Sequence, residues 1–170
     1  MFLLGLLTIP FLSFVWAISP SQDFLNVNLH TVLDLTGTLV RSQTTLNIQN
    51  TASKSVSEYT LSYPENAIDK HVSWIHVSQK HAAKDADSAQ LKVSRQGNDY
   101  KITLDAPLKP QEKTYLVIGT VYRDLVKPFP KQVAQDEKQF LEFLGNVYFY
   151  SRYPTSRQKM TVRSVVYNHL

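Results

Sequence analysis

The chain has 170 residues, enough for one domain with a compact hydrophobic core. Its composition, 43% hydrophobic and 19% charged with a formal net charge of +4, is typical of a globular protein and excludes a disordered or low-complexity chain. The absence of cysteine excludes disulfide bonds, zinc–thiolate sites and thiol nucleophiles.

The N-terminal segment predicts export. Residues 2–17 form an uncharged apolar run that is too short, and too interrupted by Pro10, to span a membrane comfortably. Val15 and Ala17 supply the small residues expected at the −3 and −1 positions of a cleavage site. We predict a signal peptide over residues 1–17, cleaved after Ala17, with an uncleaved N-terminal anchor as the alternative. In either case residues 18–170 would lie on the lumenal or extracellular side.

Alternation of apolar and polar residues is the dominant pattern after residue 23, and it indicates short strands. In the first strand, Leu25, Val27 and Leu29 are expected on the buried face and Asn26 and Asn28 on the other. The uninterrupted apolar run over 114–122 predicts a central strand covered on both faces. The predicted strands cover residues 24–33, 39–48, 56–63, 72–77, 91–95, 100–104, 114–122 and 159–167.

Turn residues divide these strands. Gly97 and Asn98 tolerate positive φ, so residues 96–99 predict a β-hairpin. Two prolines make residues 104–112 a predicted turn, and residues 81–90 are expected to form an exposed loop. The predicted fold is an all-β, antiparallel β-sandwich of about nine to ten strands in one domain, residues 18–170. The chain ends directly after a strand, so the sandwich is expected to be incomplete at its C-terminus.

Residues 124–155 form the longest connection. A Pro-Phe-Pro sequence at 128–130 is followed by a polar run, in which residues 131–140 have room for one or two helical turns. An aromatic strand is then expected, with Tyr148, Phe149, Tyr150 and Tyr153. Between residues 143 and 170 four basic residues occur without an acidic one: Arg152, Arg157, Lys159 and Arg163. We interpret them as a solvated strand face or a contact with an acidic partner, since no nucleic-acid-binding motif accompanies them.

No residue pattern predicts catalysis, a cofactor or a metal. His71, His76 and His81 are five residues apart, a spacing that sends strand side chains to opposite faces. The carboxylate pairs Asp85/Asp87 and Asp136/Glu137 lie in polar segments, where exposure to solvent is sufficient to explain them. They give little support to the hypothesis of a hydrolase. A binding module for glycans or polypeptides, free in the lumen or secreted, is the alternative function. It would use Tyr148, Tyr150, Tyr153 and Trp74 as stacking surfaces, although aromatic strand residues are more often core.

Residues 128–162 contain a set of residues at fixed offsets that matches a known family: Pro128, Pro130, Gln135, Glu137, Lys138, Gln139, Phe140, Gly145, Asn146, Tyr148, Tyr150, Ser151, Tyr153, Pro154, Thr155, Gln158 and Val162. With these residues the segment resembles the lumenal N-terminal region of ribophorin I, a family of subunits of the oligosaccharyltransferase complex. The resemblance is looser upstream, and Arg152 stands where the family pattern has proline, which is expected to loosen that turn.

The resemblance implies a non-catalytic subunit of the complex that transfers a dolichol-linked oligosaccharide to Asn in N-x-S/T. It also implies a place in the lumen of the endoplasmic reticulum, held at the membrane through the complex. The implied partners are the other subunits, including the catalytic one, and nascent polypeptides. Family members are longer, with a second lumenal domain and a membrane helix, so the chain is expected to be an N-terminal fragment or a truncated form. The expected partner contacts are Pro128, Pro130, Gln135, Lys138, Gln139, Asn146, Tyr148, Tyr150 and Tyr153.

Overall fold

The fold consists of β-strands joined by turns in a computed structural model that describes residues 23–63, 71–80, 89–137, 139–145 and 148–164. The predicted all-β class is confirmed. The predicted signal peptide lies outside the described residues. The strands within them are β1 (Phe24–Asp34), β2 (Val40–Asn50), β3 (Val56–Ser62), β4 (Val72–Lys80), β5 (Ala89–Gln90), β6 (Lys92–Gln96), β7 (Asp99–Leu108), β8 (Lys113–Tyr122), β9 (Val126–Phe129), β10 (Phe140–Phe143) and β11 (Gln158–Arg163).

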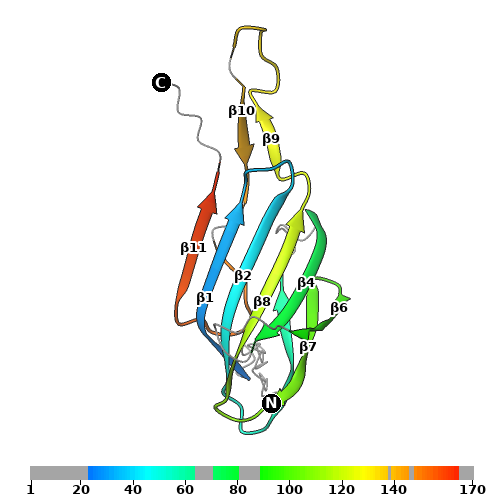
Figure 1. Cartoon of the computed structure of the whole chain (residues 1–170), viewed down its shortest axis with the longest axis vertical. Helices are drawn as coiled ribbons and strands as arrows, with labels where there is room; N and C mark the ends of the chain where they lie inside the picture. Colours follow the sequence, from blue (N-terminus) through cyan, green and yellow to red (C-terminus); the bar gives the residue numbers. More distant parts are fainter. Residues whose placement is uncertain (1–22, 64–70, 81–88, 138, 146–147, 165–170) are drawn as a thin grey trace, which may run out of the picture.

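Two sheets and a separate hairpin contain these strands. The larger sheet has six strands in the order β11-β1-β2-β8-β4-β5, and the smaller has three in the order β3-β7-β6. Strands β9 and β10 pair only with each other. Figure 1 shows this hairpin projecting beyond one end of the six-stranded sheet, roughly in line with its strands.

The hydrophobic core fills the space between the two sheets. Leu46 and Ile118 of the larger sheet share one buried cluster with Tyr59 and Ile102 of the smaller sheet. Strands that alternate buried and exposed side chains bury one face in this way, and the buried apolar area supplies the main stabilising free energy. A second cluster, centred on Leu33, Val40, Tyr122 and Leu125, also packs against side chains at the base of the hairpin.

Two local predictions are confirmed. Strand β8 lies between β2 and β4, which confirms its central position, and its residues from Leu116 to Thr120 are all buried. The predicted cover on both faces is incomplete, since Tyr115 and Val121 on the outer face are half-buried. The hairpin at residues 96–99 joins β6 to β7 with Gln96 paired to Asp99. Gly97 has φ of 61°, the positive value that type II′ turns require at the first loop position.

The first strand differs from the predicted alternation because it contains a β-bulge. The register with β2 shifts between Asn26 and Asn28. The extra residue reverses the faces, so Asn26 is fully buried, while Leu25 and Val27 are only half-buried. The predicted faces are therefore wrong for residues 25–27 and correct from Leu29 onward.

Three further elements differ from the predictions. Strand β7 continues to Leu108, through the predicted turn. Pro107 is tolerated there because the pairing of β7 with β6 ends at Thr103, so β6 needs no backbone N–H from residue 107. Residues 89–90, expected in a loop, form β5. Strand β11 pairs in parallel with β1, so the sandwich is not wholly antiparallel.

The long connection also differs from its prediction. Residues 131–137 and 139 contain no helix, and residues 148–153 form no strand. The strand formed in this region is β10, which returns the chain from the Pro-Phe-Pro sequence and pairs with it. Aromatic content favours strands only where a paired edge and a pleated surface are available, and here β11 occupies the edge of β1 instead.

Candidate partner-contact site

The projecting hairpin carries the first part of the predicted contact site. Strands β9 and β10 are antiparallel, with Phe129 opposite Phe140 and Pro128 opposite Leu141. Pro128 is tolerated because the hairpin has only two strands and each has an open edge. At the base, Val126 and Phe143 pack against the second core cluster and fix the hairpin to the sandwich.

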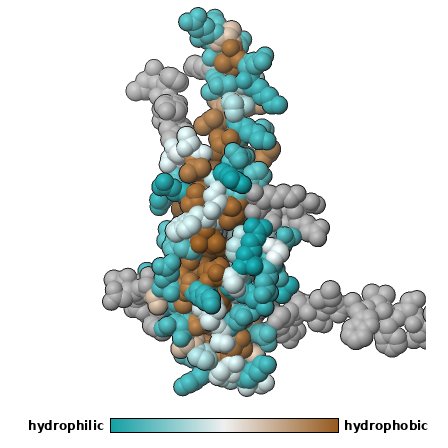
Figure 2. Space-filling model, turned by 90° about the vertical axis from the view of Figure 1, so that its right-hand side faces the viewer, coloured by the Kyte–Doolittle hydropathy of each residue, from teal (hydrophilic) through white to brown (hydrophobic). Residues whose placement is uncertain are grey.

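Both sides of the hairpin expose apolar side chains. Phe129 and Phe140 are 59% and 64% exposed on one side, and Leu141 is 71% exposed on the other. Leu144, just beyond β10, is 65% exposed. Figure 2 shows apolar residues among polar ones in this projecting part of the molecule. A group of large apolar side chains exposed on both sides of a thin element is typical of a protein-contact surface.

The loop that closes the hairpin is polar and is held by its own hydrogen bonds. The side-chain amide of Gln139 donates to the carbonyl oxygen of Pro130 at 2.9 Å. The backbone N–H of Ala134 donates to a carboxylate oxygen of Glu137 at 2.9 Å, and the N–H of Glu137 donates back to the carbonyl of Ala134 at 3.1 Å. Gln139 therefore shapes the loop. Pro130 and Gln135 are exposed on it, whereas Lys138 and Asn146 lie outside the described residues.

Tyr148 and Tyr150 lie on the inner side of the six-stranded sheet, near the base of the hairpin. They line a cavity of about 60 Å³ together with Phe143 and Phe149. Hydroxyl groups line it too, including those of Thr31 and Thr44, which hydrogen-bond each other at 3.0 Å, and of Ser42 and Thr120. Tyr148 is 71% exposed and Tyr150 41% exposed, so both present an open side to solvent.

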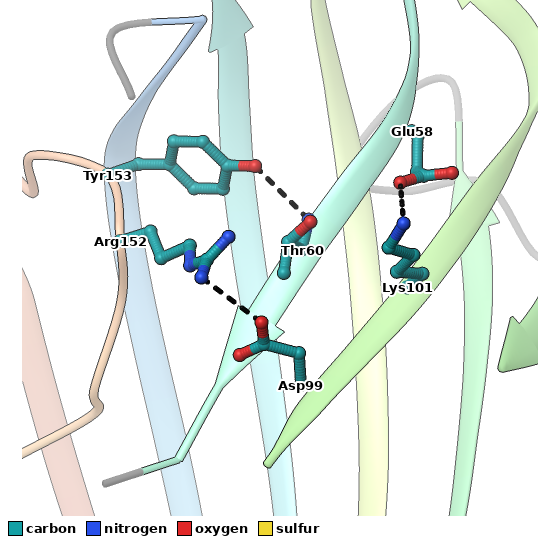
Figure 3. A network of polar contacts seen from close by, with 6 residues as sticks. All are labelled: Glu58, Thr60, Asp99, Lys101, Arg152 and Tyr153. Carbon is teal, nitrogen blue, oxygen red and sulfur yellow. Dashed lines mark hydrogen bonds and ion pairs between the residues drawn. The ribbon is translucent and has the colours of Figure 1, made fainter. Parts of the chain in front are cut away.

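Tyr153 lies in the hydrophobic core and is only 7% exposed. Its ring packs edge-on against Phe24, with centroids 5.3 Å apart, and at 4.8 Å from Tyr59. Its hydroxyl oxygen accepts a hydrogen bond from the backbone N–H of Thr60 at 3.2 Å, as Figure 3 shows. Burial raises the pKa of the Tyr153 hydroxyl, against the opposing effect of that hydrogen bond. The ring therefore joins the sheets and does not reach a partner surface.

Asn26 holds the returning chain, a role that the sequence did not reveal. Its side-chain amide donates to the hydroxyls of Ser151 at 2.9 Å and Thr155 at 3.1 Å, and its carbonyl oxygen accepts from the Tyr59 hydroxyl at 3.1 Å. Its backbone N–H donates to Pro154. The signal that could have found it is the pair of strand-disfavouring residues Asn26 and Asn28, which flank the bulge.

Arg152 connects the same segment to the smaller sheet. Its guanidinium lies 3.1 Å from a carboxylate oxygen of Asp99 at the start of β7 (Figure 3). The two side chains are 52% and 28% exposed, so the pair contributes less than about 1 kcal/mol. A second surface pair, Lys101 with Glu58 at 3.6 Å, joins β7 to β3. Where loosening was expected at Arg152, the segment gains an ion pair.

The structure does not bring together the aromatic residues that the alternative function, a binding module for glycans or polypeptides, would use. Trp74 is 54% exposed, but it lies on the outer face of the six-stranded sheet, in register with Val121. Tyr148 and Tyr150 line the cavity on the inner face, and Tyr153 is in the core. The four aromatic residues therefore do not form one surface.

Within the described ranges, no three His, Asp or Glu side chains lie close enough to hold a metal ion. His71 contacts the carbonyl of Arg123 at 3.1 Å through Nδ1, and His76 lies against Gly119. His81, Asp85 and Asp87 lie outside the described residues. The same ranges contain no helix long and apolar enough to cross a membrane.

Comparisons with known proteins relate the whole sandwich to one family. The family model described as ribophorin I matches residues 24–168, which include every strand from β1 to β11. Dolichyl-diphosphooligosaccharide–protein glycosyltransferase subunit 1 of Schizosaccharomyces pombe is 31% identical over 138 residues, 81% of this chain and 30% of that protein. Subunit 1B of Arabidopsis thaliana is 25% identical over 156 residues, 87% of this chain and 34% of that protein.

The chain thus spans about a third of the length of these two relatives. Among solved structures, an M1 zinc metallopeptidase from Deinococcus radiodurans aligns with a TM-score of 0.46 and 15% identity, over 84% of this chain and 32% of that one. A score at that level supports no functional inference. Because the family match extends over every strand from β1 to β11, the chain belongs to the ribophorin I family.

Proposed function

We propose that this chain is a non-catalytic part of the oligosaccharyltransferase complex, which transfers a dolichol-linked oligosaccharide to Asn in N-x-S/T during protein N-glycosylation. It acts in the lumen of the endoplasmic reticulum and is held at the membrane through the other subunits. The names of its relatives support this role, since they are subunits of a dolichyl-diphosphooligosaccharide–protein glycosyltransferase.

The β9–β10 hairpin is the surface that contacts another subunit. The observation that carries this proposal is the exposure of Phe129, Phe140 and Leu141 on both sides of an element with two open strand edges. Burying such side chains removes apolar area from water at about 25 cal/mol per Å², and open edges offer backbone hydrogen bonds to a partner. Nascent polypeptides, the other implied partner, would meet the same strands, because unfolded chains present apolar side chains and unpaired backbone.

The remaining predicted contacts fit around this surface. Pro128, Pro130, Gln135 and Gln139 lie on the hairpin or its loop, and Tyr148 and Tyr150 lie near its base. Lys138 and Asn146 are included in the proposed contact only because of their positions in the sequence. Tyr153 supports the contact indirectly, since it fixes the segment that follows the hairpin.

The test is co-purification of the tagged, full chain from microsomes solubilised in mild detergent. We expect the catalytic subunit to be recovered with the wild-type chain. The double substitution Phe140→Ser with Leu141→Ser is expected to weaken recovery by more than about tenfold, since buried interface anchors contribute about 2 kcal/mol or more each.

The matched control is Val162→Ser on β11, which changes a side chain that is 53% exposed and belongs to the six-stranded sheet, not to the hairpin. It should leave recovery unchanged. If the wild-type chain recovers no subunit of the complex, membership is wrong. If the double variant recovers the catalytic subunit as well as the control does, the hairpin is not the contact surface.

A further inference from the structure

The outer face of the six-stranded sheet contains a hollow that the partner contact does not use. Its volume is about 340 Å³, within the range of small-molecule sites. Two rows of residues in register across adjacent strands line it, and Figure 1 shows these strands side by side. The first row, from β11 to β4, is Arg163, Asp34, Arg41, Val121 and Trp74, and the second, from β1 to β4, is Val32, Gln43, Gly119 and His76.

A β-bulge turns Trp74 onto this face. Val72 pairs with Tyr122 and Trp74 pairs with Val121, so Ser73 is an extra residue in β4. Without it Trp74 would point between the sheets, where a large apolar side chain is ordinarily favoured. Bulges re-aim side chains at functional sites. The local backbone thus exposes a tryptophan that simple alternation would have buried.

The indole ring is supported from beneath. The rings of Trp74 and His76 stack with centroids 4.7 Å apart and planes 24° apart. His76 in turn lies directly against Gly119, where an added Cβ would come within 2.2 Å of imidazole Cε1. The glycine therefore makes room for the imidazole, and the imidazole holds the indole, so little side-chain entropy is lost when a ligand binds.

The opposite wall of the hollow supplies fixed hydrogen-bonding groups. One oxygen of Asp34 accepts hydrogen bonds from the backbone N–H and the hydroxyl of Thr36, at 2.9 and 2.6 Å. These bonds, with smaller contributions from Arg163 and Arg41, lower the pKa of Asp34, so it is a carboxylate at neutral pH. A carboxylate acceptor thus stands between two guanidinium donors in one row.

We propose that this hollow binds the ring of a neutral sugar. One face of a sugar ring presents C–H groups, which pack on the aromatic face of Trp74, and its hydroxyls both donate and accept hydrogen bonds. Alternating donors and an acceptor at Arg163, Asp34 and Arg41 match hydroxyls better than they match an acidic peptide, which Asp34 would repel. The site faces away from the cavity lined by Tyr148 and Tyr150, so it does not depend on the proposed partner contact.

Saturation-transfer NMR on the full chain tests the proposal, with N,N′-diacetylchitobiose, mannotriose and maltotriose as probes. We expect saturable transfer to at least one of them. Trp74→Ala, which changes an exposed side chain, and Arg41→Gln should each weaken binding at least about tenfold. Circular dichroism checks that both variants remain folded.

The matched control is Tyr148→Ala, which removes another exposed aromatic side chain on the opposite side of the sheet. It should bind the probes like the wild type. The proposal is overturned if no probe shows saturable transfer, if Trp74→Ala binds as well as Tyr148→Ala, or if polyglutamate binds at Arg41 while the three sugars do not.

Discussion

At the scale of single residues, one buried amide determines where the chain returns to the sandwich. Asn26 is fully buried, and its side-chain oxygen and nitrogen are both hydrogen-bonded. Buried polar groups are favourable only when they are satisfied in this way. Ser151 and Thr155 are among the residues that carry the family resemblance. Their hydrogen bonds to Asn26 give them a structural role that needs no partner.

Replacing this amide should destabilise the domain. We expect Asn26→Ala to lower the free energy of unfolding by about 2–3 kcal/mol, because the buried hydroxyl of Tyr59 and the half-buried hydroxyl of Ser151 each lose a hydrogen bond to the amide. Urea unfolding followed by circular dichroism measures the change. Asn28→Ala, an exposed position on the same strand, should stay within about 0.5 kcal/mol of the wild type. Equal stability of the two variants would contradict the role of Asn26.

At the scale of elements, the hairpin differs from the strands of the two sheets. Strands β9 and β10 have one partner each, and only their base packs on a core cluster. A two-stranded ribbon is marginally stable in water. Strand β8, in contrast, is paired on both sides and buried.

Hydrogen exchange should separate these elements. In the isolated chain we expect the amides of β9 and β10 to exchange orders of magnitude faster than those of β8, since local opening of the hairpin exposes little core. In the purified complex the hairpin amides should become protected, because the partner covers the open edges. Mass spectrometry of peptic fragments measures both states. Hairpin protection equal to that of β8 in the isolated chain would mean that the element is stable without a partner.

The elements also show what the sequence could and could not predict. Alternation located most strands, and the Gly97 turn and the central position of β8 followed from local residues. A β-bulge adds one residue to a strand and leaves no mark in the composition. The sequence therefore could not predict that Asn26 faces inward and Trp74 faces outward. The parallel pairing of β11 with β1 depends on contacts more than a hundred residues apart, which no local pattern encodes.

For the candidate site, sequence similarity marked a segment but could not assign roles within it. Tyr148 and Tyr153 are five residues apart and equally aromatic, yet one is exposed and the other is core. What distinguishes them is the approach of Phe24 and Tyr59 from distant strands. The exposure of Phe140 and Leu141 likewise depends on the hairpin projecting beyond the sheet, as Figure 1 shows.

At the scale of the whole molecule, tyrosines join the two sheets and the returning segment. Tyr59 and Tyr63 come from β3 and the residue that follows it, Tyr122 from β8, and Tyr153 from the segment before β11. Desolvation raises the pKa of each of these four hydroxyls. The free energy of unfolding of the sandwich should therefore depend on pH in the alkaline range.

The direction of this pH dependence follows from the form of the tyrosine side chain that the fold favours. The folded protein favours the neutral phenol, so its pKa lies above the value of about 10 in the unfolded chain. Below pH 10 both states keep the proton, and the full stability is present. Above pH 10 the unfolded chain releases protons that the folded protein retains, so the free energy of unfolding falls by about 1.4 kcal/mol per pH unit for each such tyrosine.

We therefore expect stability to be nearly constant from neutral pH to about pH 9 and to fall steeply above about pH 10. Urea unfolding across this range measures the slope, and phenolate absorbance reports the delayed ionisation. Tyr153→Phe should reduce the slope relative to the wild type, because one linked proton is removed. A slope that is the same in Tyr153→Phe and in the wild type would show that Tyr153 ionises alike in the folded and unfolded states, and that the core does not hold it neutral.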